Sequence, residues 1–330
     1  MSIKMKNSRK VLVFIIMYCF LCKTTLFAQD LEDTETIVYQ PVSKNTITGE
    51  IKKESILQSW KKDSNNLQSI NLNKKYTQSM ETQAYIPTKR QTTIFEDMQS
   101  KIAYSLGEYV VEPLEILGED NRTRITQTTE FPNSAICYLE MKFPDSDKIY
   151  VGTAWMYGKY MAVTAGHCVY DKSLGGWAEW IKAYPGRNGS KVPYGSYRAT
   201  VLYTDEQYLQ NESDDYDWGI LTFAQNIGSK TGYFGASYSN ADLSGTSVVL
   251  RGYPGEYYAQ MWTMSGKIVG CSKLRLNYHI DTTGGQSGSP VYKDDGKYQC
   301  VGIHIQKGFG YYNQAIRITK DLFDIMNKYR

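Results

Sequence analysis

Short hydrophobic runs separated by turn residues dominate the chain after residue 116. Ten such runs can be counted, and most contain β-branched or aromatic residues. They are SAICYLEM, YVGTAWMY, YMAVTAG, WIKAYPG, ATVLYT, WGILTFA, TSVVLRGYPG, KIVGC, LRLNYHI and SPVYKDDGKYQCVGIHI. Runs of this length and spacing are typical of antiparallel strands in barrels or sandwiches. The pattern therefore predicts an all-β domain.

Two local signals complete this pattern. The Asp-Gly pair within residues 293–297 predicts a hairpin turn inside the last run. From 319 to 329 the spacing becomes helical, with Leu322 and Met326 on one face and Thr319 as the N-cap. We expect one C-terminal helix, over residues 319–329, to follow the strands.

The first 28 residues have the pattern of a secretory signal peptide. A basic flank at residues 1–10 precedes an unbroken apolar run over residues 11–21, and the small residue Ala28 follows. A membrane-spanning helix needs about 20 apolar residues, so this run is too short to span. We predict a signal peptide over residues 1–28, a secreted extracellular protein, and no stable membrane anchor after cleavage. A short N-terminal anchor is the alternative.

Residues 29–115 differ in composition from the rest of the chain. They contain only two glycines, Gly49 and Gly107, a single tryptophan and no cysteine, and they are rich in Lys, Ser, Thr, Gln and Asn. Beyond them glycine, tryptophan and tyrosine become frequent. A polar segment between a signal peptide and a glycine-rich domain predicts a propeptide over residues 29–115. A flexible linker or cell-wall spacer is the alternative.

Composition and charge exclude several classes of protein. With 42% hydrophobic and 13% aromatic residues, the chain is not disordered throughout. The 37 basic and 34 acidic residues leave a net charge of only +3 without a basic tract, so we expect no nucleic-acid partner. The six cysteines are too few for a disulfide-built miniprotein and are not spaced like a zinc site. We expect neither a metal nor a cofactor.

A glycine-rich turn near the end of the chain carries the candidate nucleophile. Residues 281–290 read DTTGGQSGSP. An acyl-transfer serine needs such a turn, because the backbone must approach the substrate and donate N–H groups to the oxyanion. Ser287 is the candidate nucleophile, and Gly285 and Ser287 are the natural N–H donors. In isolation the motif is also that of an ordinary turn serine.

A candidate base and its partner lie earlier in the chain. His167 is one of only three histidines, and it stands in the small-residue turn TAGH after the apolar residues 160–163. Asp217 leads directly into the apolar strand at residues 218–223. A carboxylate at a strand entrance can be buried enough to orient a histidine. The three residues are therefore candidates for one catalytic site.

This arrangement resembles the chymotrypsin-like serine endopeptidases, in which His, Asp and Ser occur in this chain order. TAGHC at residues 164–168 and GQSG at residues 285–288 carry the resemblance. From about Leu117 to the C-terminus the chain is similar to the secreted bacterial glutamyl endopeptidases, the V8-like proteases. Further similar segments are Arg122-Thr123-Arg124, Trp155-Met156, Tyr184-Pro185-Gly186-Arg187-Asn188-Gly189, Gly232-Tyr233-Phe234-Gly235, Gly252-Tyr253-Pro254-Gly255 and Arg317-Ile318-Thr319-Lys320.

The resemblance implies a protease domain over residues 116–330, built from two antiparallel six-stranded β-barrels. The first barrel would span about 116–230 and the second about 231–318, before the helix at 319–329. The active site would lie in the cleft between them. The expected partners are protein or peptide substrates and the chain's own propeptide, and a monomer is expected.

The resemblance also implies the role of each site residue. His167 would be the general base, Asp217 its orienting partner and Ser287 the nucleophile. The N–H groups of Gly285 and Ser287 would form the oxyanion hole. A catalytically inactive domain that acts as a binding module is the alternative from another functional class.

The same family uses a threonine and a histidine to recognise the residue before the cleaved bond. These positions correspond to Thr282 and His304, which implies a preference for Glu or Asp at P1. We expect the imidazolium form of His304 to be the better partner of a carboxylate. Asp281 supports the opposite interpretation, because trypsin-like relatives carry an aspartate there that recognises Arg or Lys. Trypsin-like or broad specificity is therefore the alternative.

Two positions depart from the wider family. Cys168 lacks its usual partner, because Gly152 stands where that cysteine would be. The four cysteines beyond the signal peptide allow three connectivities, which the sequence does not distinguish. Gln286 replaces the aspartate that captures the new N-terminus in trypsin-like zymogens, so activation cannot use that ion pair.

Maturation is expected close to Glu115-Ile116, just before the resemblance begins. Glu115 would suit a glutamyl pocket, so the enzyme itself could make this cut. Glu112 is followed by Pro113, which makes that bond a poor substrate.

Overall fold

The computed structural model describes residues 39–54, 79–88, 95–96, 108–110, 116–307 and 312–330. The predicted signal peptide, residues 1–28, lies outside this range, as does Glu115 at the predicted cleavage site. None of the helices in the described ranges is long and apolar enough to cross a membrane.

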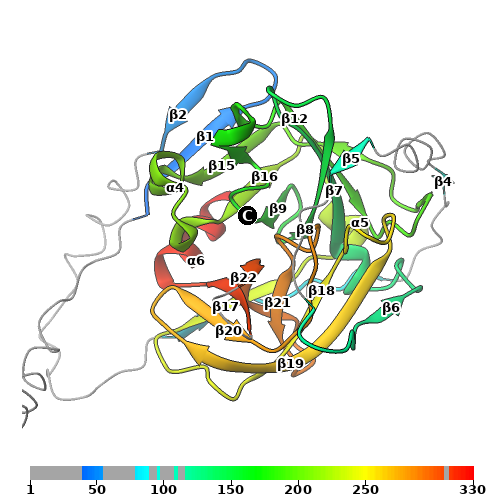
Figure 1. Cartoon of the computed structure of the whole chain (residues 1–330), viewed down its shortest axis with the longest axis vertical. Coiled ribbons are helices and arrows are strands. Elements are labelled where there is room, and N and C mark those ends of the chain that lie inside the picture. Colours follow the sequence, from blue (N-terminus) through cyan, green and yellow to red (C-terminus); the bar gives the residue numbers. More distant parts are fainter. Residues whose placement is uncertain (1–38, 55–78, 89–94, 97–107, 111–115, 308–311) are drawn as a thin grey trace, which may run out of the picture. The chain divides into compact units, whose positions relative to one another are not determined.

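The first sheet is formed mainly by residues that follow 135 (Figure 1). Most residues of its central strands are buried. Its hydrogen-bonded order is β14 (Tyr197–Arg198), β12 (Trp180–Pro185), β7 (Ile136–Lys142), β8 (Ile149–Met156), β9 (Met161–Thr164), β16 (Gly219–Thr222), β15 (Val201–Asp205), β1 (Pro41–Asn45) and β2 (Ile51–Lys53). Consecutive strands pair antiparallel. This sheet supplies the turns that carry His167 and Asp217.

The second sheet closes on itself. Its closed part runs through β21 (Pro290–Lys293), β18 (Ser247–Gly252), β19 (Met261–Cys271), β20 (Arg275–Tyr278), β23 (Asn313–Arg317) and β22 (Gln299–Lys307), with a further β21–β22 pairing. Outside the ring, β17 (Gly235–Ser239) pairs with β22, and β6 (Thr123–Ile125) pairs with β19. Alternate side chains point into the barrel, so residues such as Val248, Leu250 and Ile268 form its core.

The predicted all-β class is confirmed, and one closed six-stranded barrel is present among the described strands. The first sheet does not close by strand pairing, because β15 pairs with β1 on its outer side. In addition, β6 lies in the range assigned to the first barrel but pairs with the second sheet. The predicted hairpin near residue 295 joins two antiparallel strands, β21 and β22.

The predicted C-terminal helix is confirmed as α6 (Lys320–Tyr329). The Thr319 hydroxyl caps it by accepting from the N–H of Leu322 at 3.3 Å. The Phe323 ring lies 5.3 Å from that of Tyr238 in β17, and Tyr329 lies 4.3 Å from Tyr203 in β15. The helix therefore packs against both sheets.

The remaining elements are short. The helices are α4 (Glu206–Asn211), α5 (Gly228–Thr231), η2 (Asn133–Ala135), η3 (Lys172–Leu174) and η4 (Asp214–Tyr216). Two small sheets pair β10 (Tyr170–Asp171) with β11 (Gly176–Trp177) and β13 (Lys191–Val192) with β4 (Phe95–Glu96). Two more strands come from the N-terminal segment, namely β3 (Ser79–Glu81), paired with β17, and β5 (Tyr109–Val110), paired with β8.

Candidate active site

His167 and Asp217 are brought together by two paired strands. Strand β9 ends three residues before His167, and β16 begins two residues after Asp217, with Gly219 opposite Thr164 in the ladder. The His167 backbone N–H donates to Asp217 Oδ1 at 2.8 Å, and His167 Nδ1 lies 2.8 Å from Asp217 Oδ2. Asp217 is buried. Its two oxygens therefore fix both the backbone and the ring of the histidine.

Opposing effects set the pKa of His167. Burial disfavours the imidazolium, whereas the adjacent Asp217 carboxylate and, to a lesser extent, Cys168 favour it. The carboxylate prevails, so the pKa of His167 lies well above its ordinary value of 6.5. The ring is nevertheless reachable, because its side chain is 25% exposed.

The turn that carries Ser287 requires glycine on both sides. Gly285 has φ +92° and Gly288 has φ +86°, in the left-handed region that side chains disfavour. A Cβ at Gly288 would also lie only 2.1 Å from the Thr153 carbonyl oxygen. The glycines seen in the sequence are therefore needed for the close approach of this turn to β8.

Thr153 in β8 holds the same turn by donating hydrogen bonds to two of the turn's carbonyl groups. Its N–H donates to the Ser287 carbonyl at 2.9 Å, and its hydroxyl donates to the Gly285 carbonyl at 2.8 Å. The N–H groups of Gly285 and Ser287 make no hydrogen bond with the described part of the chain. They are therefore available as donors to a bound oxyanion.

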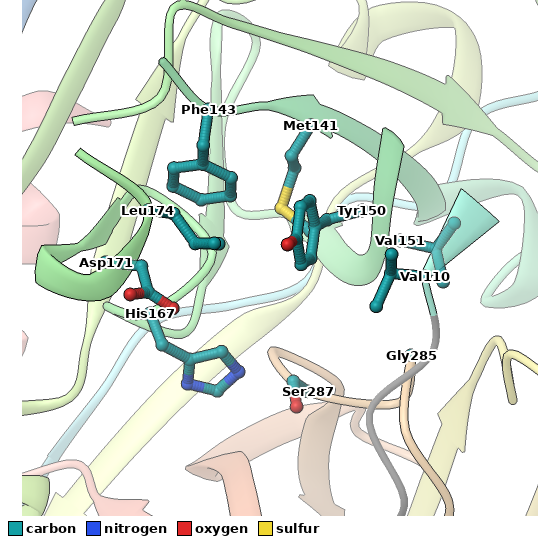
Figure 2. Close-up of a pocket in the computed structure, with 10 residues that line it drawn as sticks. All are labelled: Val110, Met141, Phe143, Tyr150, Val151, His167, Asp171, Leu174, Gly285 and Ser287. Carbon is teal, nitrogen blue, oxygen red and sulfur yellow. The ribbon is translucent and has the colours of Figure 1, made fainter. Parts of the chain in front are cut away.

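Ser287 and His167 lie beside the same pocket, as Figure 2 shows. The Ser287 hydroxyl donates to the Ile305 carbonyl at 3.2 Å. Catalytic hydrogen bonds are often long or unformed without substrate. Apolar side chains cover the other side of the pocket, namely Val110, Met141, Phe143, Tyr150, Val151 and Leu174.

Thr282 and His304 are fully buried on either side of the Ser287 turn in sequence. The His304 N–H donates to the Ser289 carbonyl, and its carbonyl accepts from Gly288. Two side-chain atoms, Thr282 Oγ1 and His304 Nε2, have no hydrogen-bond partner among the described residues. Buried polar atoms are normally paired, and these are two of fourteen buried side-chain atoms without a partner in the described part of the chain. Neither residue is among those that line the pocket beside Ser287.

The expectation that His304 carries a positive charge is wrong, because the ring is fully buried. Burial lowers the pKa of His304 to about 3, so the ring is neutral at neutral pH. Its Nδ1 lies 2.7 Å from the Tyr278 hydroxyl and 3.1 Å from the Gln314 carbonyl. The Gln314 carbonyl can only accept, which places the proton of the neutral ring on Nδ1, whereas a Tyr278 O–H that donates to Nδ1 places this proton on Nε2. Only in the second tautomer does His304 offer an Nε2–H donor, and in neither does it carry a positive charge.

Asp281 is engaged elsewhere. Its Oδ1 accepts from the N–H of Leu117 at 2.8 Å, and its Oδ2 accepts from the N–H of Asn121 at 3.1 Å. The residue is only 2% exposed. Its carboxylate therefore anchors the segment at residues 117–121.

The four cysteines beyond the signal peptide are all free thiols, so none of the three connectivities forms. Cys168 lies against Gly152, where an added Cβ would be 3.0 Å from its sulfur. Gly152 thus leaves space for the free thiol of Cys168.

Sequence reasoning missed two residues that shape this site, Thr153 and Tyr278. Both act through contacts with residues more than 20 positions away. A buried polar residue within an apolar run was the only available signal for either.

Comparisons with known proteins agree with this geometry. Residues 152–303 match the model of the trypsin-like peptidase domain. A glutamyl endopeptidase of Bacillus licheniformis is 38% identical over 224 residues, covering 65% of this chain and 69% of that protein. An extracellular metalloprotease of Bacillus subtilis is 36% identical over 218 residues, with the same coverage of each chain. A solved Glu endopeptidase in complex with MPD shares 28% identity and a TM-score of 0.59, covering 65% of this chain and 98% of that one.

The names of the two Bacillus proteins point to different protease classes. The trypsin-like domain model and the Glu endopeptidase structure both support the serine class. The B. licheniformis relative supports the same class, because it is 38% identical to this chain over more than two thirds of its own length. The chain therefore belongs to the glutamyl endopeptidase family of chymotrypsin-like serine endopeptidases.

Proposed function

We propose that this protein is a secreted serine endopeptidase that cleaves after Glu, with Asp as a weaker alternative at P1. His167, Asp217 and Ser287 act as base, orienting residue and nucleophile. The observation that carries the P1 preference is the pair of buried, unpartnered atoms, Thr282 Oγ1 and His304 Nε2.

The reaction follows from the positions of these groups. Ser287 Oγ attacks the scissile carbonyl while His167 Nε2 accepts its proton, and Asp217 stabilises the imidazolium. The N–H groups of Gly285 and Ser287 donate to the oxyanion. His167 then gives the proton to the leaving amine, which leaves an acyl-enzyme. Water, activated by the same histidine, hydrolyses the ester and restores Ser287.

The chemistry of the two unpartnered atoms suits a P1 carboxylate. A buried carboxylate must accept hydrogen bonds, and a threonine hydroxyl and a neutral imidazole N–H can each donate one. Such bonds to a charged group are stronger than neutral ones. The uncharged amide of P1 Gln is therefore bound less well.

Trypsin-like specificity requires a free carboxylate in the pocket. Asp281 is the candidate, and both its oxygens already accept backbone N–H groups of the segment at residues 117–121. Binding a P1 Arg or Lys there would break these bonds in a buried place. This favours Glu over a basic P1 residue.

We expect His304→Ala to lower kcat/KM for a P1 Glu peptide by roughly ten- to a hundred-fold. Removing one partner of a charged group costs on the order of 1.5–3 kcal/mol. Cleavage of the matched P1 Gln peptide should fall much less. The measurement is a panel of peptides that differ only at P1, with Glu, Asp, Gln, Leu and Arg. Because the pKa of His304 is about 3, the Glu-over-Gln ratio of the unmodified enzyme should stay constant from about pH 5 to 8.

Thr282→Val is the matched variant, since it removes one hydroxyl and keeps the shape. It should also reduce the Glu-over-Gln ratio, by a smaller factor than His304→Ala. Faster cleavage after Arg than after Glu by the unmodified enzyme would refute the proposed specificity.

Class-selective inhibitors test the serine mechanism independently of P1. A phosphonylating serine reagent should abolish activity, whereas a metal chelator should leave the proposed triad working. Loss with the chelator alone would instead support metal-dependent hydrolysis, the class in the name of the B. subtilis relative. Absence of any hydrolysis in the folded mature protein would support the binding module.

The proposal includes a propeptide over residues 29–115. Support for a propeptide over a loose spacer comes from the pairing of its described parts with both sheets. Strand β1 extends the first sheet by pairing with β15, and β3 pairs with β17. The buried Tyr39 ring packs 5.5 Å from Tyr216, beside Asp217. Val110 of β5 lines the pocket next to Ser287.

We expect Glu115→Gln to slow maturation by at least about ten-fold, because the enzyme's own pocket would prefer Glu at this bond. N-terminal sequencing of the secreted protein measures it, with Ile116 as the expected first residue. Glu112→Gln is the matched control and should mature normally, since Pro113 already blocks that bond. Active enzyme that keeps residues 29–100 would contradict the propeptide.

Extracellular location is part of the same proposal. It is supported by the signal-like first 28 residues and by the extracellular B. subtilis relative.

A further inference from the structure

Arg122 is a buried arginine whose hydrogen bonds converge on the turn before the nucleophile. Its side chain is only 2% exposed. Its Nη1 donates to Gln286 Oε1 and to Thr283 Oγ1, both at 2.8 Å. The other donors reach two carboxylates, with Nε and Nη2 on Asp120 and Nη2 also on Glu256. All five N–H groups of the guanidinium are thus matched by five contacts.

Gln286 transmits this contact to the backbone. It stands between Gly285 and Ser287, is 1% exposed, and its Oε1 also accepts from the Thr283 N–H at 2.9 Å. The side chain therefore folds back over its own turn. The Gln286 N–H donates to the Thr283 carbonyl at 3.1 Å, which tightens the same turn. Any movement of Gln286 would move the flanking N–H groups.

Arg122 is itself fixed by two independent anchors. Asp281 holds the preceding residues through the N–H groups of Leu117 and Asn121. On the other side, β6 begins at Thr123 and pairs with β19 of the closed barrel. The guanidinium therefore meets the turn from a backbone that is held at both ends.

We propose that Arg122 is a positioning residue that sets the oxyanion turn through Gln286. It does not touch substrate. It holds the N–H groups of Gly285 and Ser287 in the geometry that stabilises the transition state. This inference rests on the proposed serine mechanism.

Arg122→Met tests the inference in the mature enzyme. We expect kcat for a P1 Glu peptide to fall roughly ten- to a hundred-fold, with KM within about three-fold, since misplaced oxyanion donors act on the transition state. Rates are normalised to the concentration of serine that reacts with a phosphonylating reagent. Gln286→Met should give the same split between kcat and KM.

A double-mutant cycle separates positioning from stability. If Arg122 acts through Gln286, the double variant should have nearly the kcat of either single variant. Arg317→Met is the matched control, because Arg317 is equally buried but donates to the carbonyls of Ser239 and Ala241. It should lower the melting temperature and leave kcat unchanged.

Three results would overturn the inference. They are an unchanged kcat in folded Arg122→Met, a loss equal to that of Arg317→Met, and additive losses in the cycle. If Arg122→Met does not fold, an unchanged kcat in Gln286→Met overturns it alone. Failure of the unmodified enzyme to cleave after Glu through Ser287 would instead count against the proposed function.

Discussion

Ser287→Ala should abolish proteolysis while the protein still folds. Loss of the nucleophile in a triad enzyme lowers kcat by about 10⁴- to 10⁶-fold, because only binding and the oxyanion donors remain. The structural change is small, since the hydroxyl makes a single hydrogen bond, to the Ile305 carbonyl. We expect a stability change of about 1 kcal/mol. Peptide hydrolysis and the melting temperature are measured on the same preparation.

Ser289→Ala is the matched control for this variant. Ser289 is a fully buried serine two residues further on, and its hydroxyl has no partner among the described residues. Its removal should leave kcat within a few-fold of the unmodified enzyme. Undiminished hydrolysis by Ser287→Ala, with Ser289→Ala as a comparison, would remove Ser287 from the mechanism.

The elements that sequence predicts best here are those fixed by local pattern. The run at residues 160–166 contains β9, and the run at residues 218–224 contains β16. Leu322 and Met326 are buried in α6, as their helical spacing predicts. These elements bury one face through nearby residues, so alternation and caps within a short window suffice.

The sequence did not predict the interactions between segments that lie far apart in the chain. The bond from Arg122 to Gln286 spans 164 positions, and so does that from Leu117 to Asp281. No local pattern marks either contact. The interpretation of Asp281 as a pocket residue stayed open because motif spacing cannot tell which way a carboxylate turns.

A motif predicts where a histidine lies in the fold, but it does not predict how burial shifts the pKa of that histidine. His304 was expected to carry a charge, yet full burial lowers its pKa to about 3. The opposite holds at His167, where the adjacent carboxylate outweighs burial and raises the pKa. The pKa values of two histidines with the same ordinary value thus shift in opposite directions, because the interactions with Asp217 and Cys168 outweigh burial only at His167.

Asp217→Asn should lower kcat by about 10⁴-fold at neutral pH, although it changes few atoms. The amide oxygen can still accept from the His167 backbone N–H, as Oδ1 does now. The amide nitrogen then faces Nδ1 and donates to it, which moves the ring proton to Nε2. A protonated Nε2 cannot accept the proton of Ser287, so the base is lost while the geometry is kept.

The pH profile distinguishes this explanation from simple misfolding. In the unmodified enzyme kcat/KM should rise with pH as His167 loses its proton, with a midpoint above 6.5, because Asp217 raises the pKa. Without the carboxylate the largest contribution that raises the pKa of His167 is lost while burial still lowers it, so the midpoint of Asp217→Asn should move down and its relative loss should be smaller at acidic pH. Asp215→Asn is the control, since Asp215 is half-exposed and pairs with Arg275. A midpoint that stays in place in Asp217→Asn would show that this carboxylate does not charge-compensate His167.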